Sequence, residues 1–315
     1  MGKPLKTISG RRATGHVLPE FLYQPEVGSW RDSWSVIWAH VSMIRVGDTF
    51  MAAVGTIIGA RLSGIENLSP GMILLVMTAI SMLSAGSMIF NDWRDAAIDL
   101  INKPRRAIPS GKVPRGRALI MAGVMFLLAV VFAAVADPKL GMCLAIMVGA
   151  AVLYTLKLKQ VPFLGNTLVA ILAASPIWCW LLLASNPSST FIVLILALVL
   201  LNLGREIART VEDIPGDQAH HISTVATTFG AGKTTLISAS LVTIALLLTW
   251  GPVVLGTATW LYFTAVSFTS VFTIIYGAKG LSAACPAPAR QWAICGKIAT
   301  VILALGAGIG ITNLA

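Results

Sequence analysis

Three aspartates stand where a long apolar run ends, in the stretch that begins at Asn91. Asp92, Asp95 and Asp99 are spaced i, i+3, i+7, so a helix would carry the three carboxylates on one face, within about 10 Å. Like charges on one stripe repel, and near a membrane each costs roughly 2–3 kcal/mol more to desolvate. A bound cation would relieve both costs. Mg²⁺, which combines a few carboxylates with water and substrate phosphates, is the natural candidate.

A second charged helix end runs from residue 205 to 217. Its arginines and aspartates follow i, i+4 spacing, although Pro215 is expected to break the last turn. Two facing carboxylate clusters suit a bridging set of Mg²⁺ ions with a diphosphate as guest. The predicted metal ligands are Asp92, Asp95, Asp99, Asp213 and Asp217. The cations expected to neutralise the diphosphate are Arg94, Lys103, Arg105, Arg106, Lys157, Arg205 and Arg209.

The composition indicates which elements position these residues. The chain of 315 residues is 56% hydrophobic and only 11% charged, with a mean hydropathy of +0.82, whereas a soluble domain carries about 25% charged residues. This is typical of a polytopic membrane protein. The net charge of +10 is spread between apolar runs rather than gathered into a basic domain, so we expect it to reflect membrane topology and not a nucleic-acid partner.

The apolar runs predict an all-α membrane protein, a single bundle with a central cavity and cytoplasmic cap loops. We expect about nine transmembrane helices, at roughly 34–60, 71–90, 118–136, 139–156, 163–184, 191–204, 235–250, 252–276 and 292–312. Residues 1–32 are predicted to form a basic cytoplasmic arm, and residues 33–315 the transmembrane domain. Trp178 and Trp180 are assigned to an interfacial aromatic belt.

Lysine and arginine concentrate in alternate loops, namely those after the second, fourth, sixth and eighth predicted spans. The positive-inside rule therefore predicts that these loops and the N-terminus are cytoplasmic and that the C-terminus lies on the opposite side. Both acidic stretches then lie on one membrane face.

Apolar helices around a diphosphate site favour an isoprenyl diphosphate as the substrate. Mg²⁺ and basic side chains would stabilise the departing pyrophosphate and leave an allylic carbocation. Aromatic faces can stabilise such a cation, and exclusion of water prevents its capture as an alcohol.

At this point the residues resemble a known family. Asn91–Asp99, followed by Asn102-Lys103-Pro104 and Ile108–Gly111, is similar to the NDxxDxxxD signature and RPIPSG-like stretch of the UbiA superfamily of membrane prenyltransferases. Residues 205–217 resemble its second, DxxxD signature. The segment 154–157 is similar to its YTxxK segment, and Gly165-Asn166 to the GN that follows.

The resemblance implies a prenyl diphosphate donor (geranyl, farnesyl or geranylgeranyl), two Mg²⁺ ions and a cavity capped by the loops after helices two and six. It also implies that Arg105, Arg106 and Lys157 contact the diphosphate. Asn91, Tyr154 and Asn166 are expected to add supporting contacts.

One position departs from the family pattern. The first helix usually carries arginine followed three residues later by asparagine, but here Asp48 follows Arg45. Charges within a span usually face the bundle interior and serve function, so both join the candidate catalytic residues. Asp48 could adjust metal binding, hold Arg45 or act as a base toward the acceptor. Alternatively, the two form a buried ion pair that serves packing alone.

The acceptor stays open at this stage. We favour a lipophilic aromatic or quinone-like ring, because no dedicated second phosphate site is evident beyond the basic loops. Transfer to a glycerol-phosphate precursor of ether lipids, and cyclisation of the prenyl diphosphate alone as in UbiA-type terpene cyclases, are the alternatives, with a transporter as a remote one. His220 and His221 are expected in a loop at the rim of the site.

Overall fold

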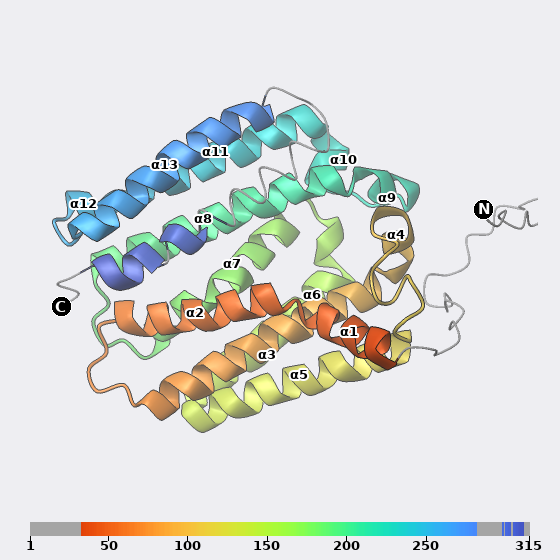
Figure 1. Cartoon of the computed structure of the whole chain (residues 1–315), viewed down its shortest axis with the longest axis horizontal. Helices are drawn as coiled ribbons and strands as arrows, with labels where there is room; N and C mark the ends of the chain where they lie inside the picture. Colours follow the sequence, from red (N-terminus) through yellow and green to blue (C-terminus); the bar gives the residue numbers. More distant parts are fainter. Residues whose placement is uncertain (1–32, 282–297, 299, 304, 312–315) are drawn as a thin grey trace, which may run out of the picture.

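The computed structural model describes residues 33–281, 298, 300–303 and 305–311, and within them the chain is built from helices (Figure 1). The all-α prediction is confirmed. The predicted arm, residues 1–32, lies outside the described residues. The elements are α1 (Ser33–Ile44), α2 (Val46–Leu62), α3 (Pro70–Arg94), α4 (Ala96–Asn102), α5 (Arg115–Ala136), α6 (Pro138–Leu156), η2 (Leu158–Gln160), α7 (Leu164–Trp178), η3 (Cys179–Leu182), α8 (Ser189–Glu212), α9 (Ile214–Ala219), α10 (Val225–Phe229), α11 (Ala231–Thr249), α12 (Gly251–Val254) and α13 (Trp260–Leu281).

Seven helical segments in the described part of the chain are long and apolar enough to cross a membrane. They match the first seven predicted spans, although the first is broken at Arg45 into α1 and α2. The predicted count of nine is not confirmed. The eighth predicted span corresponds largely to α13, which lies beside α11 (Figure 1). Much of the ninth falls among residues that are not described.

Helices α3, α6 and α8 all run toward the end of the molecule where the short helices α4 and α9 lie (Figure 1). Each starts at a side-chain cap: the oxygens of Ser69, Asp137 and Ser188 accept backbone hydrogen bonds from Met72, Lys139 and Phe191. Caps of this kind contribute about 1 kcal/mol each. Because the three helices run in the same direction, their C-terminal ends meet at this end of the molecule. These ends carry partial negative charge, which favours the binding of cations there.

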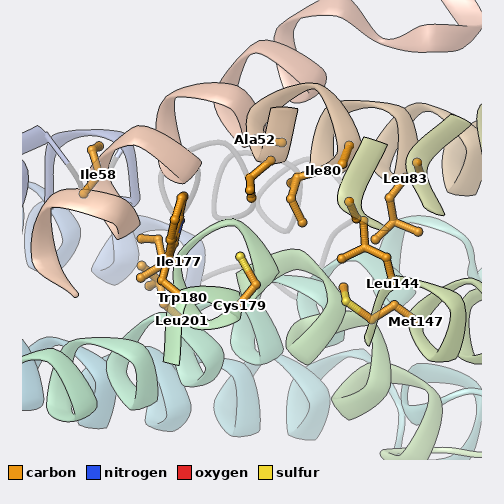
Figure 2. Close-up of a cluster of buried hydrophobic side chains, with 14 of the residues drawn as sticks. Ala52, Ile58, Ile80, Leu83, Leu144, Met147, Ile177, Cys179, Trp180 and Leu201 are labelled. Carbon is orange, nitrogen blue, oxygen red and sulfur yellow. The ribbon is translucent and has the colours of Figure 1, made fainter. Parts of the chain in front are cut away.

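The core is held by close approaches between helices at small residues. Gly86 on α3 faces Phe126 on α5, and Gly204 on α8 faces Val242 on α11. Figure 2 shows part of the central cluster, in which Ile177 and Trp180 lie together with Leu201 of α8, and Leu144 and Met147 of α6 lie beside Leu83.

Trp180 contradicts the predicted aromatic belt. Its side chain is fully buried, and its indole N–H donates to the Thr56 carbonyl oxygen at 2.9 Å. The 3₁₀ turn η3, which follows Pro176 in α7, turns the indole into the bundle against α2. The belt assignment was wrong for Trp180 because sequence position near a span end does not reveal the direction of a side chain.

Gly59→Ala should destabilise the protein, because a Cβ at Gly59 would lie 2.8 Å from the Ile177 Cα and the Pro176 carbonyl oxygen, both backbone atoms. We expect a cost of about 1–3 kcal/mol, seen as a lower melting temperature of the detergent-purified protein. The control is Gly47→Ala in the same helix, where a Cβ meets nothing within 4 Å. Equal melting temperatures for the two variants would contradict this account of the α2–α7 contact.

Candidate active site

The first acidic stretch forms a helix junction rather than one continuous helix. α3 ends at Arg94, Asp95 stands at the junction with φ −82° and ψ 4°, and α4 begins at Ala96. The prediction of a single helical face is therefore corrected. Asp92, Asp95 and Asp99 are nevertheless all buried, with at most 6% of each residue exposed.

Each of these carboxylates has a basic partner from a different part of the chain. Asp92 accepts from Arg45 at 2.7 Å and from Arg106 at 2.9 Å. Arg106 also donates to Asp99 at 2.6 Å, and Lys159 donates to Asp95 at 2.5 Å. These charge-assisted contacts offset the cost of burying the carboxylates.

The pKa values of this cluster reflect that balance. Burial raises the pKa of Asp99, and the adjacent Arg106 guanidinium opposes the rise. Burial alone would lower the pKa of Lys159, but the neighbouring Asp95 carboxylate raises it above its ordinary value. The half-buried lysine therefore stays charged.

Arg45 separates α1 from α2 and has a left-handed backbone conformation, with φ 50° and ψ 63°. Non-glycine residues rarely adopt this conformation. The break allows the guanidinium to reach Asp92, so Arg45 belongs to the acidic cluster and does not serve packing alone. Asp48 is half-buried on the first turn of α2.

The second acidic stretch meets the first through α4 and α9. Lys103 donates to the Asp213 carboxylate at 2.8 Å. The Asn102 side chain accepts from the backbone N–H of Gly216 at 3.0 Å and donates to the Asp213 carbonyl oxygen at 3.3 Å. A Cβ at Gly216 would lie 2.4–2.6 Å from the Asn102 amide, so a larger residue there would displace that amide from its two hydrogen bonds. The two stretches thus lie at one end of the bundle, as the topology argument predicted.

Asp217 on α9 is also buried and joins none of the ion pairs described here. Burial raises the pKa of its carboxyl to about 6, although Lys159 opposes the shift and Asp213 adds to it. A carboxylate with a raised pKa in a group of like charges is typical of a functional site.

Two functional candidates escaped the sequence analysis. Lys159, not Lys157, pairs with Asp95, because η2 follows α6 and brings Lys159 inward while Lys157 stays exposed. Glu206 on α8 pairs with Arg209 at 3.0 Å and Arg205 at 3.4 Å. In the sequence, Glu206 could have been found from its position between Arg205 and Arg209. Nothing in the sequence distinguished Lys159 from Lys157.

The remaining predicted residues lie around the same end of the bundle. Asn91 and Arg94 are half-buried on the last turn of α3, Tyr154 on the last turn of α6 and Asn166 on the first turn of α7, while Arg105 is exposed in the loop after α4. His220 and His221 directly follow α9, in the loop where they were expected.

A cavity of about 530 Å³ opens beside Asp92. Its walls come from the end of α1, the α1–α2 break and the loop after α4. It is lined by Ser42, Met43, Arg45, Asp92, Asn102, Lys103, Pro104, Arg105, Arg106 and Ala107. Four of these side chains are basic.

The donor chemistry fits Mg²⁺. Within the described residues no three His, Cys, Asp or Glu side chains form a closed metal cage, but Mg²⁺ is usually bound by one or two carboxylates together with water and substrate phosphates. The side-chain oxygen of Asn91 is buried without a hydrogen-bond partner beside Asp92. Such an oxygen requires a donor or a cation.

Comparison with known proteins supplies a family. Residues 52–301 match the model of the UbiA prenyltransferase family. The chain is 39% identical over 170 residues, 53% of its own length and 60% of the other, to a protein of Methanoregula boonei named digeranylgeranylglyceryl phosphate synthase. A protein of the same name from Halobacterium salinarum strain R1 is 33% identical over 241 residues, 76% of this chain and 86% of that protein.

Solved structures agree on the fold. One described as a study of digeranylgeranylglyceryl phosphate synthase in membranes has a TM-score of 0.67 at 25% identity, covering 88% of this chain and 98% of the other. A UbiA homologue from Archaeoglobus fulgidus, solved with DMAPP and Mg²⁺, has a TM-score of 0.62 at 16% identity, covering 86% and 99%.

Asn102→Ala should loosen α9, because it removes both hydrogen bonds that tie this helix end to α4. We expect amide deuterium uptake in residues 214–219 to become roughly tenfold faster, as two net hydrogen bonds contribute of the order of 1–2 kcal/mol. Hydrogen-exchange mass spectrometry measures this, with peptides from α5 as the internal reference. Unchanged uptake in α9 would show that this contact does not hold the two stretches together.

Proposed function

Because this chain belongs to the UbiA prenyltransferase family, we propose that it transfers a geranylgeranyl group from its diphosphate to a hydroxyl of a glycerol-phosphate ether lipid. That it is a multi-pass membrane prenyltransferase follows from the family and the seven apolar helices. The donor chain length and the acceptor are the proposed part. We further propose that the acidic end of the bundle faces the cytoplasm, since the basic loops gather there.

The acceptor class rests on one observation, the name shared by the relatives described above. Digeranylgeranylglyceryl phosphate is glycerol phosphate bearing two geranylgeranyl groups, so its synthase adds a prenyl chain to a phosphate-bearing lipid. This favours the glycerol-phosphate alternative over the aromatic acceptor that the sequence analysis preferred. The basic cavity beside Asp92 is consistent with it.

The five buried or half-buried aspartates are proposed as ligands of two Mg²⁺ ions. Bound there, Mg²⁺ would neutralise the diphosphate and stabilise it as a leaving group. Holding Mg²⁺ would take Asp95 from Lys159, its present partner, and Asp92 from Arg45 and Arg106. The released Lys159 would then pair with diphosphate oxygens, which gives it a role in holding the donor, while Arg106 keeps its contact with Asp99.

The reaction that this arrangement supports is a substitution at C1 of the donor. The C1–oxygen bond breaks, and pyrophosphate leaves with the electron pair. The acceptor hydroxyl oxygen bonds to C1, and its proton is lost. Asp48, on the first turn of α2 next to Arg45, stays the candidate base predicted from the sequence. Burial of the acidic end limits access of water to the cation.

Purified protein incubated with geranylgeranyl diphosphate, Mg²⁺ and geranylgeranylglyceryl phosphate should form the diether phosphate, detected by mass spectrometry. EDTA should abolish product, because the carboxylates hold the metal that activates the leaving group. Parallel incubations contain the donor alone or the donor with a phenolic acceptor. A cyclic hydrocarbon from the donor alone would identify a cyclase, and a prenylated phenol would restore the aromatic proposal.

Lys159→Gln should lower kcat/KM for the donor by at least about 100-fold, since it removes a buried charge-assisted contact at the proposed metal site. Lys157→Gln tests the position that the family resemblance indicated, two residues away and exposed. We expect a much smaller loss for Lys157→Gln. A larger loss of kcat/KM in Lys157→Gln than in Lys159→Gln would instead assign the diphosphate contact to Lys157.

A further inference from the structure

The cavity beside Asp92 carries an excess of positive charge. Its lining contains Arg45, Lys103, Arg105 and Arg106 against a single carboxylate, Asp92. Three of the cations already have carboxylate partners, with Arg45 and Arg106 on Asp92 and Lys103 on Asp213. Arg105 is exposed and takes part in none of the ion pairs found in the described part of the chain. The cavity therefore favours an anionic guest.

The charge of the donor complex argues against placing that complex in the cavity. Two Mg²⁺ ions bring four positive charges to a diphosphate with about three negative ones, so the complex as a whole is cationic and suits carboxylates. An anion that binds without metal suits the cavity better. A phosphate monoester, with a charge of about −1.5 to −2 near pH 7, matches the surplus of arginine and lysine there.

We propose that this cavity binds the phosphate of the acceptor and that Arg105 is its principal contact. The inference rests on the proposed glycerol-phosphate acceptor and deepens it. It moves Arg105 from the donor diphosphate, where the family resemblance had placed it, to the acceptor. Arginine suits this role because its planar donor groups can hold a phosphate through two hydrogen bonds.

The position of the cavity also fits the reaction. Asp92 lines it and is at the same time a proposed metal ligand, so the two sites share a wall. In a glycerol phosphate with one free hydroxyl beside the phosphate-bearing carbon, a phosphate held in the cavity keeps that hydroxyl close to the metal-bound donor. The 530 Å³ volume accommodates a glycerol phosphate headgroup, since ligand pockets range from about 300 to 1,000 Å³.

The test is to measure, in the variant Arg105→Gln, the KM for the acceptor and the KM for the donor separately. We expect KM for geranylgeranylglyceryl phosphate to rise by about tenfold or more, the usual effect of losing a hydrogen bond to a charged group, while KM for geranylgeranyl diphosphate changes by less than about twofold. The matched control is Lys112→Gln, which removes one positive charge from an exposed position of the same loop that does not line the cavity. It should change neither KM.

Binding without metal provides a second measurement. In EDTA, an alkylglycerol phosphate should raise the melting temperature of the wild-type protein, whereas the matching alkylglycerol without phosphate should not. Arg105→Gln should lose this shift and melt like the wild type when no lipid is added. The donor should produce its own shift only with Mg²⁺.

The outcomes separate this inference from the proposed function. If the wild-type protein does not prenylate the glycerol phosphate, the proposed function fails, and the binding measurement in EDTA still decides whether the cavity holds a phosphate. If it does prenylate it, but Arg105→Gln raises the donor KM as much as the acceptor KM or changes neither, the assignment of the cavity is overturned while the function stands.

Discussion

The structure of the candidate site depends on one constraint: the carboxylates buried at the end of this apolar bundle must be neutralised. Asp92, Asp95 and Asp99 are almost inaccessible to solvent, and an unpaired buried charge costs several kcal/mol. Each is matched by a cation from elsewhere: Arg45 from the α1–α2 break, Arg106 from the loop after α4 and Lys159 from η2. The positions of these three connecting segments are therefore coupled to the charges of one short stretch of α3 and α4.

The same pairing explains how such a site can be stable and still accept a substrate. Arginine and lysine neutralise the carboxylates as long as no divalent ion is bound. If these carboxylates held Mg²⁺, as proposed, the cations paired with them would be left to bind anions such as a diphosphate. Metal and donor would then bind cooperatively. Metal binding would deprive the cations of their carboxylate partners, and the diphosphate would give them new anionic partners. Asp217, whose pKa burial raises to about 6, fits this scheme as a buried carboxylate outside the ion pairs described above.

Much of the fold and the chemistry could be predicted from the sequence, for physical reasons that also explain the errors. Apolar length predicted the helices, and the spacing of Asp92, Asp213 and their neighbours predicted two acidic helix ends. The distribution of lysine and arginine predicted that both ends lie on one side. Spacing carries no information on where a helix is interrupted, so the junction at Asp95 was missed. The direction of a side chain after a 3₁₀ turn is equally hidden, which is why Lys159 and the buried Trp180 were not foreseen. The proposed acceptor was not predicted, because the roles predicted for the acidic motifs concern the donor alone.

Arg45 connects these observations in one residue. Its left-handed backbone costs roughly 1 kcal/mol relative to a helical one, and a continuous first span would avoid that cost. The break instead brings the guanidinium to Asp92 at 2.7 Å and makes the end of α1 a wall of the basic cavity through Ser42 and Met43. A charge-assisted contact to a buried carboxylate contributes about 1.5–3 kcal/mol, enough to offset the strained backbone. Glycine would relieve the strain but would leave Asp92 with Arg106 alone, a partner that Asp99 already shares. The backbone break is thus retained by the charge that it positions, and the residues beside it form one wall of the cavity.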